Sequence, residues 1–181
     1  MNTHSVTLLL GGVRSGKSNL AQSMLMKAER VAMIATAEAL DEEMSRRIAR
    51  HKADRPSNWT TVESPLDLEA ALEECSGKYD AVLIDCLTLW TSNLMYALHN
   101  DSSAILKRVE KLCEVLSKID ASVVLVSNEV GSGIMPMNAD ARLYVDLLGA
   151  VNRQVAAVAD RVLLLVAGIP MTVKDTTGEQ K

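Results

Sequence analysis

The sequence lacks any long apolar run. No segment approaches the about 18 consecutive apolar residues that a transmembrane helix needs, so we expect no membrane span. The first residues, MNTHSVTLLLGG, carry no basic leader, and their apolar stretch is too short for a signal peptide. These two absences predict a protein that neither crosses a membrane nor is exported.

Cysteine is also scarce, and acidic residues outnumber basic ones. Cys75, Cys86 and Cys113 lie far apart, form no CxxC pair and are odd in number, which favours reduced thiols in a cytoplasmic protein. The formal net charge is −4 and the sequence pI is near 5.4, which disfavours a general nucleic-acid-binding role. Any site for a polyanion must therefore be local.

Short apolar runs rich in β-branched residues recur along the chain. They predict the buried strands of a parallel sheet over Val6–Leu10, Val31–Ala35, Ala81–Ile84, Val123–Val126 and Val162–Val166. Apolar residues at helical spacing lie between them, with Leu20, Met24 and Ala28 on one face after Lys17, and again over Leu66–Glu74, Ile105–Ile119 and Leu143–Ala159. This alternation predicts one α/β domain over residues 1–181, with a mostly parallel central sheet flanked by helices. In such domains ligands bind beyond the carboxyl ends of the strands.

The first predicted strand is followed by GGVRSGKS, residues 11–18, which fits the phosphate-binding pattern G-x-x-x-x-G-K-[ST]. In that pattern the glycines let backbone N–H groups surround phosphate oxygens, Lys17 reaches the β- and γ-phosphates, and Ser18 ligates Mg²⁺. The alternative is a glycine turn that binds nothing, and the strand before it and the helix after it argue against that. Arg14 is equally well interpreted as a further phosphate cation or as a surface arginine.

Polar residues follow three other predicted strands. Asp85 ends the apolar run of AVLIDC and is interpreted as the second half of the Mg²⁺ site, the alternative being a cap of the next helix. Glu38, just after the second strand, either reads the donor edge of a nucleotide base or opens the acidic first turn of a helix. Asn128 and Glu129 either contact substrate or form an ordinary turn.

The segment RRIARHKADRP, residues 46–56, sets a histidine among several cations. A helix from about Asp41 would carry Met44, Ile48 and His51 on one face, with acidic residues in its first turn and basic residues in its later turns. On this evidence alone, His51 is more often a core or boundary residue than a nucleophile. Beside a phosphate-binding loop, however, the cations have a natural partner in a nucleoside triphosphate.

Four stretches carry a family resemblance. They are GGVRSGKS, the pattern IATAEALDEEM…RI..HK..RP..W.T.E over Ile34–Glu63, LIDCLTLWTSNLM and VVLVSNEVG.GI.P. In this order and spacing they resemble the bifunctional adenosylcobinamide kinase/adenosylcobinamide-phosphate guanylyltransferase family of cobalamin biosynthesis. The resemblance covers nearly the whole chain, to NRQVAAVADRVLLLVAGIP. The phosphate-binding loop alone is shared with many unrelated enzymes, whereas its combination with the histidine segment is much more specific.

The resemblance implies a RecA-like P-loop NTPase fold, a homo-oligomer that is a trimer, and two reactions. Adenosylcobinamide is phosphorylated with ATP or GTP at its aminopropanol hydroxyl. GMP is then transferred from GTP to that phosphate through a guanylylated histidine, giving adenosylcobinamide-GDP and pyrophosphate. His51 occupies the position of that histidine. The implied GTP contacts are Gly11, Gly12, Val13, Arg14, Ser15, Gly16, Lys17, Ser18, Thr36, Ala37, Glu38, Lys52, Ala53, Asp54, Arg55, Glu63 and Asp85.

The chemistry of the histidine segment is consistent with this assignment. A neutral imidazole nitrogen can attack an α-phosphorus, and neighbouring Arg and Lys residues disfavour the imidazolium form. Two other functions remain open from the residues themselves. One is a P-loop small-molecule kinase without guanylyltransferase activity, in which His51 is structural. The other is a non-catalytic nucleotide-binding module.

Overall fold

The computed structural model of the chain describes residues 4–38, 42, 45–46 and 56–178. In this part of the chain one sheet has the strand order β3-β2-β4-β5-β1-β6-β7. Neighbouring strands are parallel except β6 and β7, which are antiparallel. The strands are β1 Val6–Gly11, β2 Val31–Ala35, β3 Thr60–Glu63, β4 Ala81–Asp85, β5 Ser122–Val126, β6 Arg161–Val166 and β7 Ile169–Asp175.

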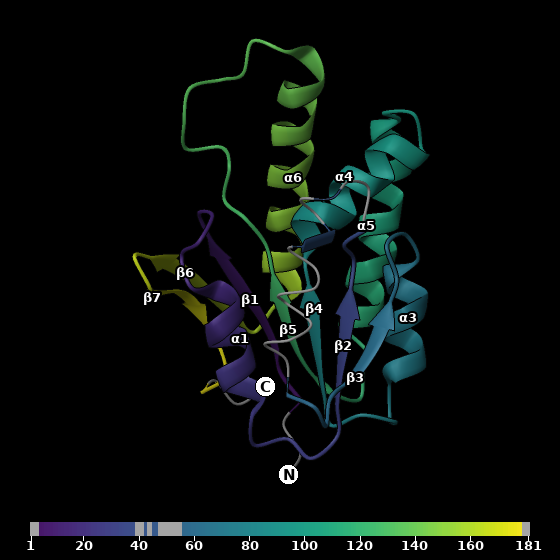
Figure 1. Cartoon of the computed structure of the whole chain (residues 1–181), viewed down its shortest axis with the longest axis vertical. Helices are drawn as coiled ribbons and strands as arrows, with labels where there is room; N and C mark the ends of the chain where they lie inside the picture. Colours follow the sequence, from purple (N-terminus) through teal and green to yellow (C-terminus); the bar gives the residue numbers. More distant parts are fainter. Residues whose placement is uncertain (1–3, 39–41, 43–44, 47–55, 179–181) are drawn as a thin grey trace.

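Helices pack on both faces of this sheet (Figure 1). One face is covered by α1, and the other by α3, α4, α5 and α6. Their bounds are α1 Lys17–Leu25, α3 Leu68–Cys75, α4 Leu87–Ala97, α5 Ser102–Leu116 and α6 Ala139–Val158. The mostly parallel α/β fold that the sequence predicts is therefore confirmed.

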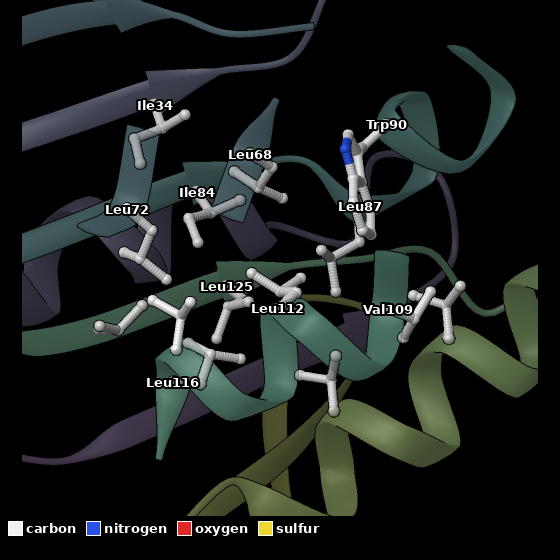
Figure 2. Close-up of a cluster of buried hydrophobic side chains, with 14 of the residues drawn as sticks. Ile34, Leu68, Leu72, Ile84, Leu87, Trp90, Val109, Leu112, Leu116 and Leu125 are labelled. Atoms are coloured by element: carbon white, nitrogen blue, oxygen red, sulfur yellow. The ribbon is translucent and has the colours of Figure 1, made fainter. Parts of the chain in front are cut away.

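The core consists of two apolar clusters because side chains alternate between the faces of each strand. Leu8 belongs to the larger cluster, whereas its neighbour Leu9 belongs to the smaller cluster with Ala21 and Leu25 of α1. Figure 2 shows part of the larger cluster, in which Ile34, Ile84 and Leu125 of the sheet lie near Leu68, Leu72, Leu87, Trp90, Val109, Leu112 and Leu116 of the helices. Burial on both faces explains why the five strands predicted from the sequence are mostly continuous apolar runs.

The five predicted strands all occur, but β3, β7 and α4 are not predicted from the sequence. The predicted face of α1 is also one position off, since Ala21 and Leu25 are fully buried while Leu20 and Met24 are only partly buried. Ala28 lies beyond the end of this helix. The helix predicted from Asp41 lies mostly outside the described residues, although Glu42, Ser45 and Arg46 are helical.

The described residues can be compared with two expectations from the sequence, one on membrane spans and one on the cysteines. No helix among them is both long and apolar enough to cross a membrane. Cys75, Cys86 and Cys113 are all free thiols. Burial raises the pKa of each of these thiols, and for Cys86 it does so to about 11.

Replacement of Leu83 by alanine tests the smaller cluster. Leu83 is only 1% exposed at the centre of β4, so Leu83→Ala is expected to lower the free energy of unfolding by about 2–5 kcal/mol through lost burial and a residual cavity. Val173→Ala, at a side chain 65% exposed on β7, is the control and is expected to change it by about 0.5 kcal/mol or less. Urea unfolding followed by circular dichroism measures both. Equal effects would contradict the assigned core.

Candidate functional site

Parallel pairing brings the carboxyl ends of six strands, β1 to β6, to one edge of the sheet. Glu63 and Asp85 both lie opposite Ala35, and Asp85 and Leu9 both lie opposite Val126. With strands about 4.8 Å apart, Asp85 is about 10 Å across the sheet from β1, and Glu63 is about 19 Å from it. The predicted site residues that are described therefore follow neighbouring strand ends along one edge.

The loop between β1 and α1 is shaped by its glycines. A side chain at Gly11, whose φ is 151°, would have its Cβ 2.5 Å from the Leu165 carbonyl oxygen and 2.7 Å from Ser15 Oγ. Gly16 has a φ of 92° directly before α1, a conformation that favours glycine. Arg14 also has a positive φ and its side chain is exposed. The loop thus has the strand, turn and helix context that the phosphate-binding pattern requires.

Lys17 is folded into this loop and is only 7% exposed. Its Nζ donates to the carbonyl oxygens of Gly11 at 2.8 Å and Gly12 at 2.7 Å, and to Ser15 Oγ at 3.4 Å. Burial lowers the pKa of the ammonium group, whereas Cys86 and Asp85 act in the opposite direction. A cation is therefore held at the centre of the loop by groups that a phosphate can replace.

The ends of β2 and β4 are joined through Thr36, which is fully buried. Its Oγ1 donates to the Cys86 carbonyl oxygen and accepts from the Cys86 N–H, both at 2.8 Å. Its own N–H donates to the Asp85 carbonyl oxygen at 3.1 Å. The side chain of Thr36 thus fixes the backbone beside Asp85, while Ala37 is half-buried and Glu38 is exposed.

The end of β5, between β1 and β4, is held by buried polar groups that the sequence analysis did not identify. The Asn128 N–H donates to Thr88 Oγ1 at 2.8 Å, and Asn152 Nδ2 donates to the Asn128 carbonyl oxygen at 3.0 Å. Ser127 Oγ donates to Asn152 Oδ1 at 2.6 Å. Glu129 N–H donates to the Gly11 carbonyl oxygen at 3.2 Å, so this turn is tied directly to the phosphate-binding loop.

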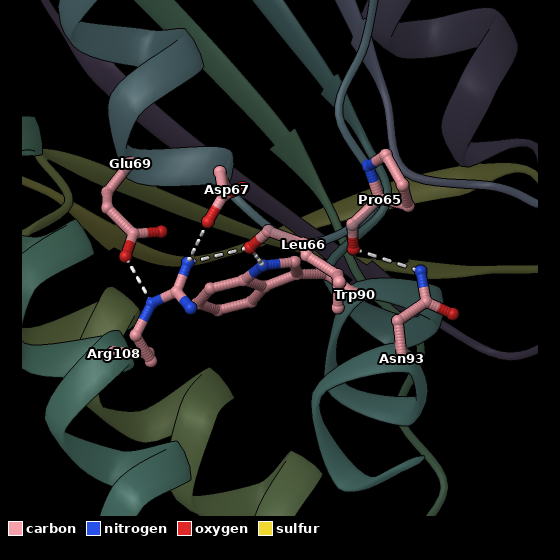
Figure 3. A network of polar contacts seen from close by, with 7 residues as sticks. All are labelled: Pro65, Leu66, Asp67, Glu69, Trp90, Asn93 and Arg108. Carbon is pink, nitrogen blue, oxygen red and sulfur yellow. Dashed lines mark hydrogen bonds and ion pairs between the residues drawn. The ribbon is translucent and has the colours of Figure 1, made fainter. Parts of the chain in front are cut away.

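The turn after β3 is held by a second network (Figure 3). Trp90 Nε1 and Arg108 Nη2 both donate to the Leu66 carbonyl oxygen at 2.9 Å, and Arg108 Nη2 also donates to Asp67 Oδ1 at 3.0 Å. Arg108 Nε donates to the buried carboxylate of Glu69, and this bond raises the pKa of the guanidinium. Glu63, two residues before the turn, is exposed.

The donors expected for Mg²⁺ are Ser18 at the start of α1 and Asp85 at the end of β4, both half-buried at this edge. A hydroxyl and a carboxylate are hard oxygen ligands, and Mg²⁺ prefers to be held by one or two of these together with water and substrate phosphates. The residues present therefore fit the ion. Within the described segments, no cluster of three or more His, Cys, Asp or Glu side chains offers an all-protein metal site.

The predicted nucleophile and its neighbours cannot be placed at this edge. His51, Lys52, Ala53, Asp54 and Arg55 lie outside the described residues. The residues Gly11–Ser18, Thr36–Glu38, Glu63 and Asp85 all lie at the carboxyl edge. The edge therefore unites the phosphate-binding and acidic positions that the sequence singles out.

Solved structures support the fold. A prototypical ATPase from the type III secretion system of pathogenic bacteria matches with a TM-score of 0.58 and 12% identity, covering 93% of this chain and 56% of that one. EscN, the type III secretion ATPase of enteropathogenic E. coli, matches with a TM-score of 0.59 and 11% identity, covering 91% of this chain and 43% of that one. This chain thus spans about half of those ATPases, and the likeness confirms the P-loop NTPase fold alone.

Sequence relatives are far more similar. The bifunctional adenosylcobalamin biosynthesis protein CobP of Pseudomonas aeruginosa is 44% identical over 168 residues, which are 92% of this chain and 96% of that protein. The bifunctional adenosylcobalamin biosynthesis protein CobU of Salmonella typhimurium is 39% identical over 178 residues, covering 92% of this chain and 98% of that protein. The sequence profile described as cobinamide kinase / cobinamide phosphate guanyltransferase matches residues 7–173. The predicted resemblance is thereby confirmed, and the chain belongs to the cobinamide kinase / cobinamide phosphate guanyltransferase family.

Proposed function

We propose that this chain carries out both reactions of its family at the carboxyl edge of its sheet. It phosphorylates the aminopropanol hydroxyl of adenosylcobinamide with ATP or GTP, and then transfers GMP from GTP to adenosylcobinamide phosphate through a guanylylated His51. The observation that carries the proposal is Lys17, buried within a phosphate-binding loop about two strands away from the carboxylate of Asp85. Family membership supports the two activities.

In the kinase step the loop residues Gly11–Ser18 bind the triphosphate through backbone N–H groups and the Lys17 ammonium. The substrate hydroxyl oxygen attacks the γ-phosphorus, the bond from that phosphorus to the β,γ-bridging oxygen breaks, and the hydroxyl proton is released. Ser18 and Asp85 would hold Mg²⁺, which when bound neutralises charge on the phosphate oxygens. Lys17 adds a fixed positive charge where negative charge accumulates on the leaving diphosphate.

In the guanylyl step a neutral nitrogen of His51 attacks the α-phosphorus of GTP, and pyrophosphate leaves as the P–N bond forms. A phosphate oxygen of adenosylcobinamide phosphate then attacks the same phosphorus, the P–N bond breaks, and the imidazole is regenerated. Lys52–Arg55 contribute nucleotide contacts, and the arginines and lysine near His51 in the sequence favour the neutral imidazole. Acceptor oxygens of Glu38 and Glu63 pair with the N–H donors of guanine, and the Thr36–Glu38 backbone lines the base.

The same proposal includes a homo-oligomer, a trimer, working in the cytoplasm without nucleic acid. Exposed apolar side chains support an assembly: Ile134 is 99% exposed in the loop before α6, and Ile169, Met171 and Val173 of β7 are 55–67% exposed. The net charge of −4 is consistent with the absence of a nucleic-acid partner. Sedimentation equilibrium of the purified chain tests the trimer.

Lys17→Ala is expected to weaken both reactions, because one loop binds the phosphates in both. Loss of one charge-assisted contact of about 1.5–3 kcal/mol corresponds to a loss of about 10- to 150-fold in kcat/KM. Steady-state assays of phosphorylation and guanylyl transfer measure it. Lys27→Ala, an exposed lysine just after the same helix, is the control that should leave both rates unchanged. A folded Lys17→Ala protein with normal rates would refute this use of the loop.

Asp85→Asn is expected to raise the Mg²⁺ concentration needed for half-maximal turnover by about tenfold or more, because an amide is a weaker ligand than a carboxylate. Magnesium titrations of the kinase reaction measure this effect. Asp80→Asn is the matched control, since Asp80 directly precedes β4 and binds Arg30 at 2.6 Å far from the carboxyl edge. Normal turnover at an unchanged Mg²⁺ requirement would refute the metal-binding role of Asp85.

His51→Ala is expected to abolish the covalent GMP adduct and guanylyl transfer while much of the kinase activity survives. Direct γ-phosphoryl transfer needs the loop but no covalent histidine. The assay incubates the protein with α-labelled GTP and looks for acid-labile, alkali-stable label on the denatured chain. His99→Asn is the control, since His99 is exposed and its φ of 48° suits asparagine.

If His51 is instead a buried core residue, His51→Ala is expected to lower the stability of the protein and to reduce both activities together. Thermal melting is therefore measured on the same samples. An adduct of undiminished yield in a well-folded His51→Ala protein would exclude His51 as the nucleophile. Kinase activity without any adduct in the unaltered chain would favour the kinase alone.

A further inference from the structure

The segment LTLWTSNLM, residues 87–95, belongs to α4, and neither reaction above uses its side chains. One of them, Asn93, bridges two loops of the carboxyl edge. Its Nδ2 donates to the Thr36 carbonyl oxygen at 2.8 Å and to the Pro65 carbonyl oxygen at 3.0 Å. Figure 3 shows Asn93 reaching from its helix toward Pro65. A single amide group thus ties the segment after β2 to the segment after β3.

Asn93 acts where backbone pairing between these strands ends. The last backbone bond joining β2 and the residue after β3 runs from Ser64 N–H to the Ala35 carbonyl oxygen at 2.9 Å. Pro65 has no N–H and cannot extend the pairing as a donor. Because the Thr36 and Pro65 carbonyl oxygens both lie within 3.0 Å of one nitrogen, they are no more than about 6 Å apart. The side chain of Asn93 therefore continues the junction by one further step.

The two segments joined in this way carry the acidic residues of the proposed base site. Glu38 follows Thr36 by two residues, and Glu63 precedes Pro65 by two residues. Both side chains are exposed at the edge of the sheet, so the spacing of the backbones beneath them contributes to the separation of the carboxylates. Asn93 holds these backbones together beyond the last backbone bond between the two strands.

The phosphate-binding loop does not depend on the same contact. Glu63 is about 19 Å across the sheet from β1. The loop is held by Lys17, which donates to the Gly11 and Gly12 carbonyl oxygens, and by the Glu129 N–H bond to Gly11. Loosening the β2–β3 junction should therefore alter recognition of the base without altering recognition of the triphosphate.

We infer that Asn93 is a positioning residue for guanine, which holds the Glu38 and Glu63 segments at the separation that lets their carboxylates accept from the guanine N–H donors. Guanine carries a 2-amino donor that adenine lacks, so this spacing favours GTP over ATP. The inference rests on the proposed function, since it takes these two segments to be the base site. Asn93 itself lies outside that site, on α4, and sets the preference of the site between GTP and ATP.

The decisive variant is Asn93→Asp, which keeps the size of the side chain but removes both N–H donors. The GTP concentration for half-maximal GMP adduct formation should rise about tenfold or more, because two partly buried carbonyls lose their shared donor and separate. The KM for ATP and the kcat of the kinase reaction should stay within about twofold of those of the unaltered chain, because the phosphate-binding loop is unaffected. Asn93→Ala removes the same donors without adding a carboxylate and should give the same split.

Trp90→Phe is the matched control on the same helix. It removes the Nε1 donor to the Leu66 carbonyl oxygen, one residue beyond Pro65, and leaves both bonds of Asn93 intact. It should lower the melting temperature, because Trp90 is fully buried, while the GTP dependence of adduct formation stays within about twofold. Melting temperature, adduct formation against GTP and kinase activity against ATP are measured on each protein.

The outcomes separate this inference from the proposed function. If the unaltered chain forms no adduct and phosphorylates nothing, the proposed function fails whatever Asn93 does. If the unaltered chain does both, the inference is overturned by an unchanged GTP dependence in Asn93→Asp and Asn93→Ala, or by equal changes for GTP and ATP. An equal rise in Trp90→Phe would also overturn it, as would unfolding of both Asn93 variants at the assay temperature.

Discussion

Because β3, β2, β4, β5 and β1 pair in parallel without a break, backbone hydrogen bonds between strands set where the loops of the candidate site begin. The ladder determines which strand ends are neighbours and how far apart their first loop residues lie. The first residues of these loops therefore have positions set by the sheet. Residues as distant in sequence as Gly11, Glu63 and Glu129 are thereby brought to one edge of the sheet.

The edge has two halves that are braced separately, and α4 contributes to both. On the phosphate half, Thr88 accepts from the Asn128 N–H at the end of β5. On the half formed by β2 and β3, Trp90 and Asn93 donate to the turn that follows β3. These residues lie within two turns of one helix, whose buried residues include Leu87, Leu94 and Met95. The packing of α4 therefore holds donors and acceptors against both halves of the edge as well as filling the interior.

Much of this arrangement could be predicted from local sequence, and the exceptions have physical causes. The segment Gly11–Ser18 and the carboxylate of Asp85 are recognisable because their chemistry is carried by neighbours in the chain. By contrast, Asn93, Thr88 and Asn152 act through side-chain bonds to backbone groups 24 to 57 residues away. No local pattern records such bonds, because they exist only after the helices have packed.

The unpredicted elements have equally specific causes. The α4 segment LTLWTSNLMYA has no charged residue, so it lacks the polar stripe that reveals an amphipathic helix. β3 is only four residues long and mostly exposed. β7 contains Pro170, which weakens a strand prediction but is tolerated on an edge strand.

The bonds of Lys17 also bear on how readily nucleotides can be exchanged. When the ammonium turns toward a phosphate, the Gly11 carbonyl oxygen keeps the Glu129 N–H as a partner, and the carbonyl of exposed Gly12 can accept from water. Neither oxygen is left buried without a donor, so the lysine changes partners at little cost in either direction. Because the number of hydrogen bonds is nearly conserved, the net gain on binding comes from charge, and it weakens as salt concentration rises. In the proposed function, this exchange of partners would let the loop bind a triphosphate and release the products after each turnover.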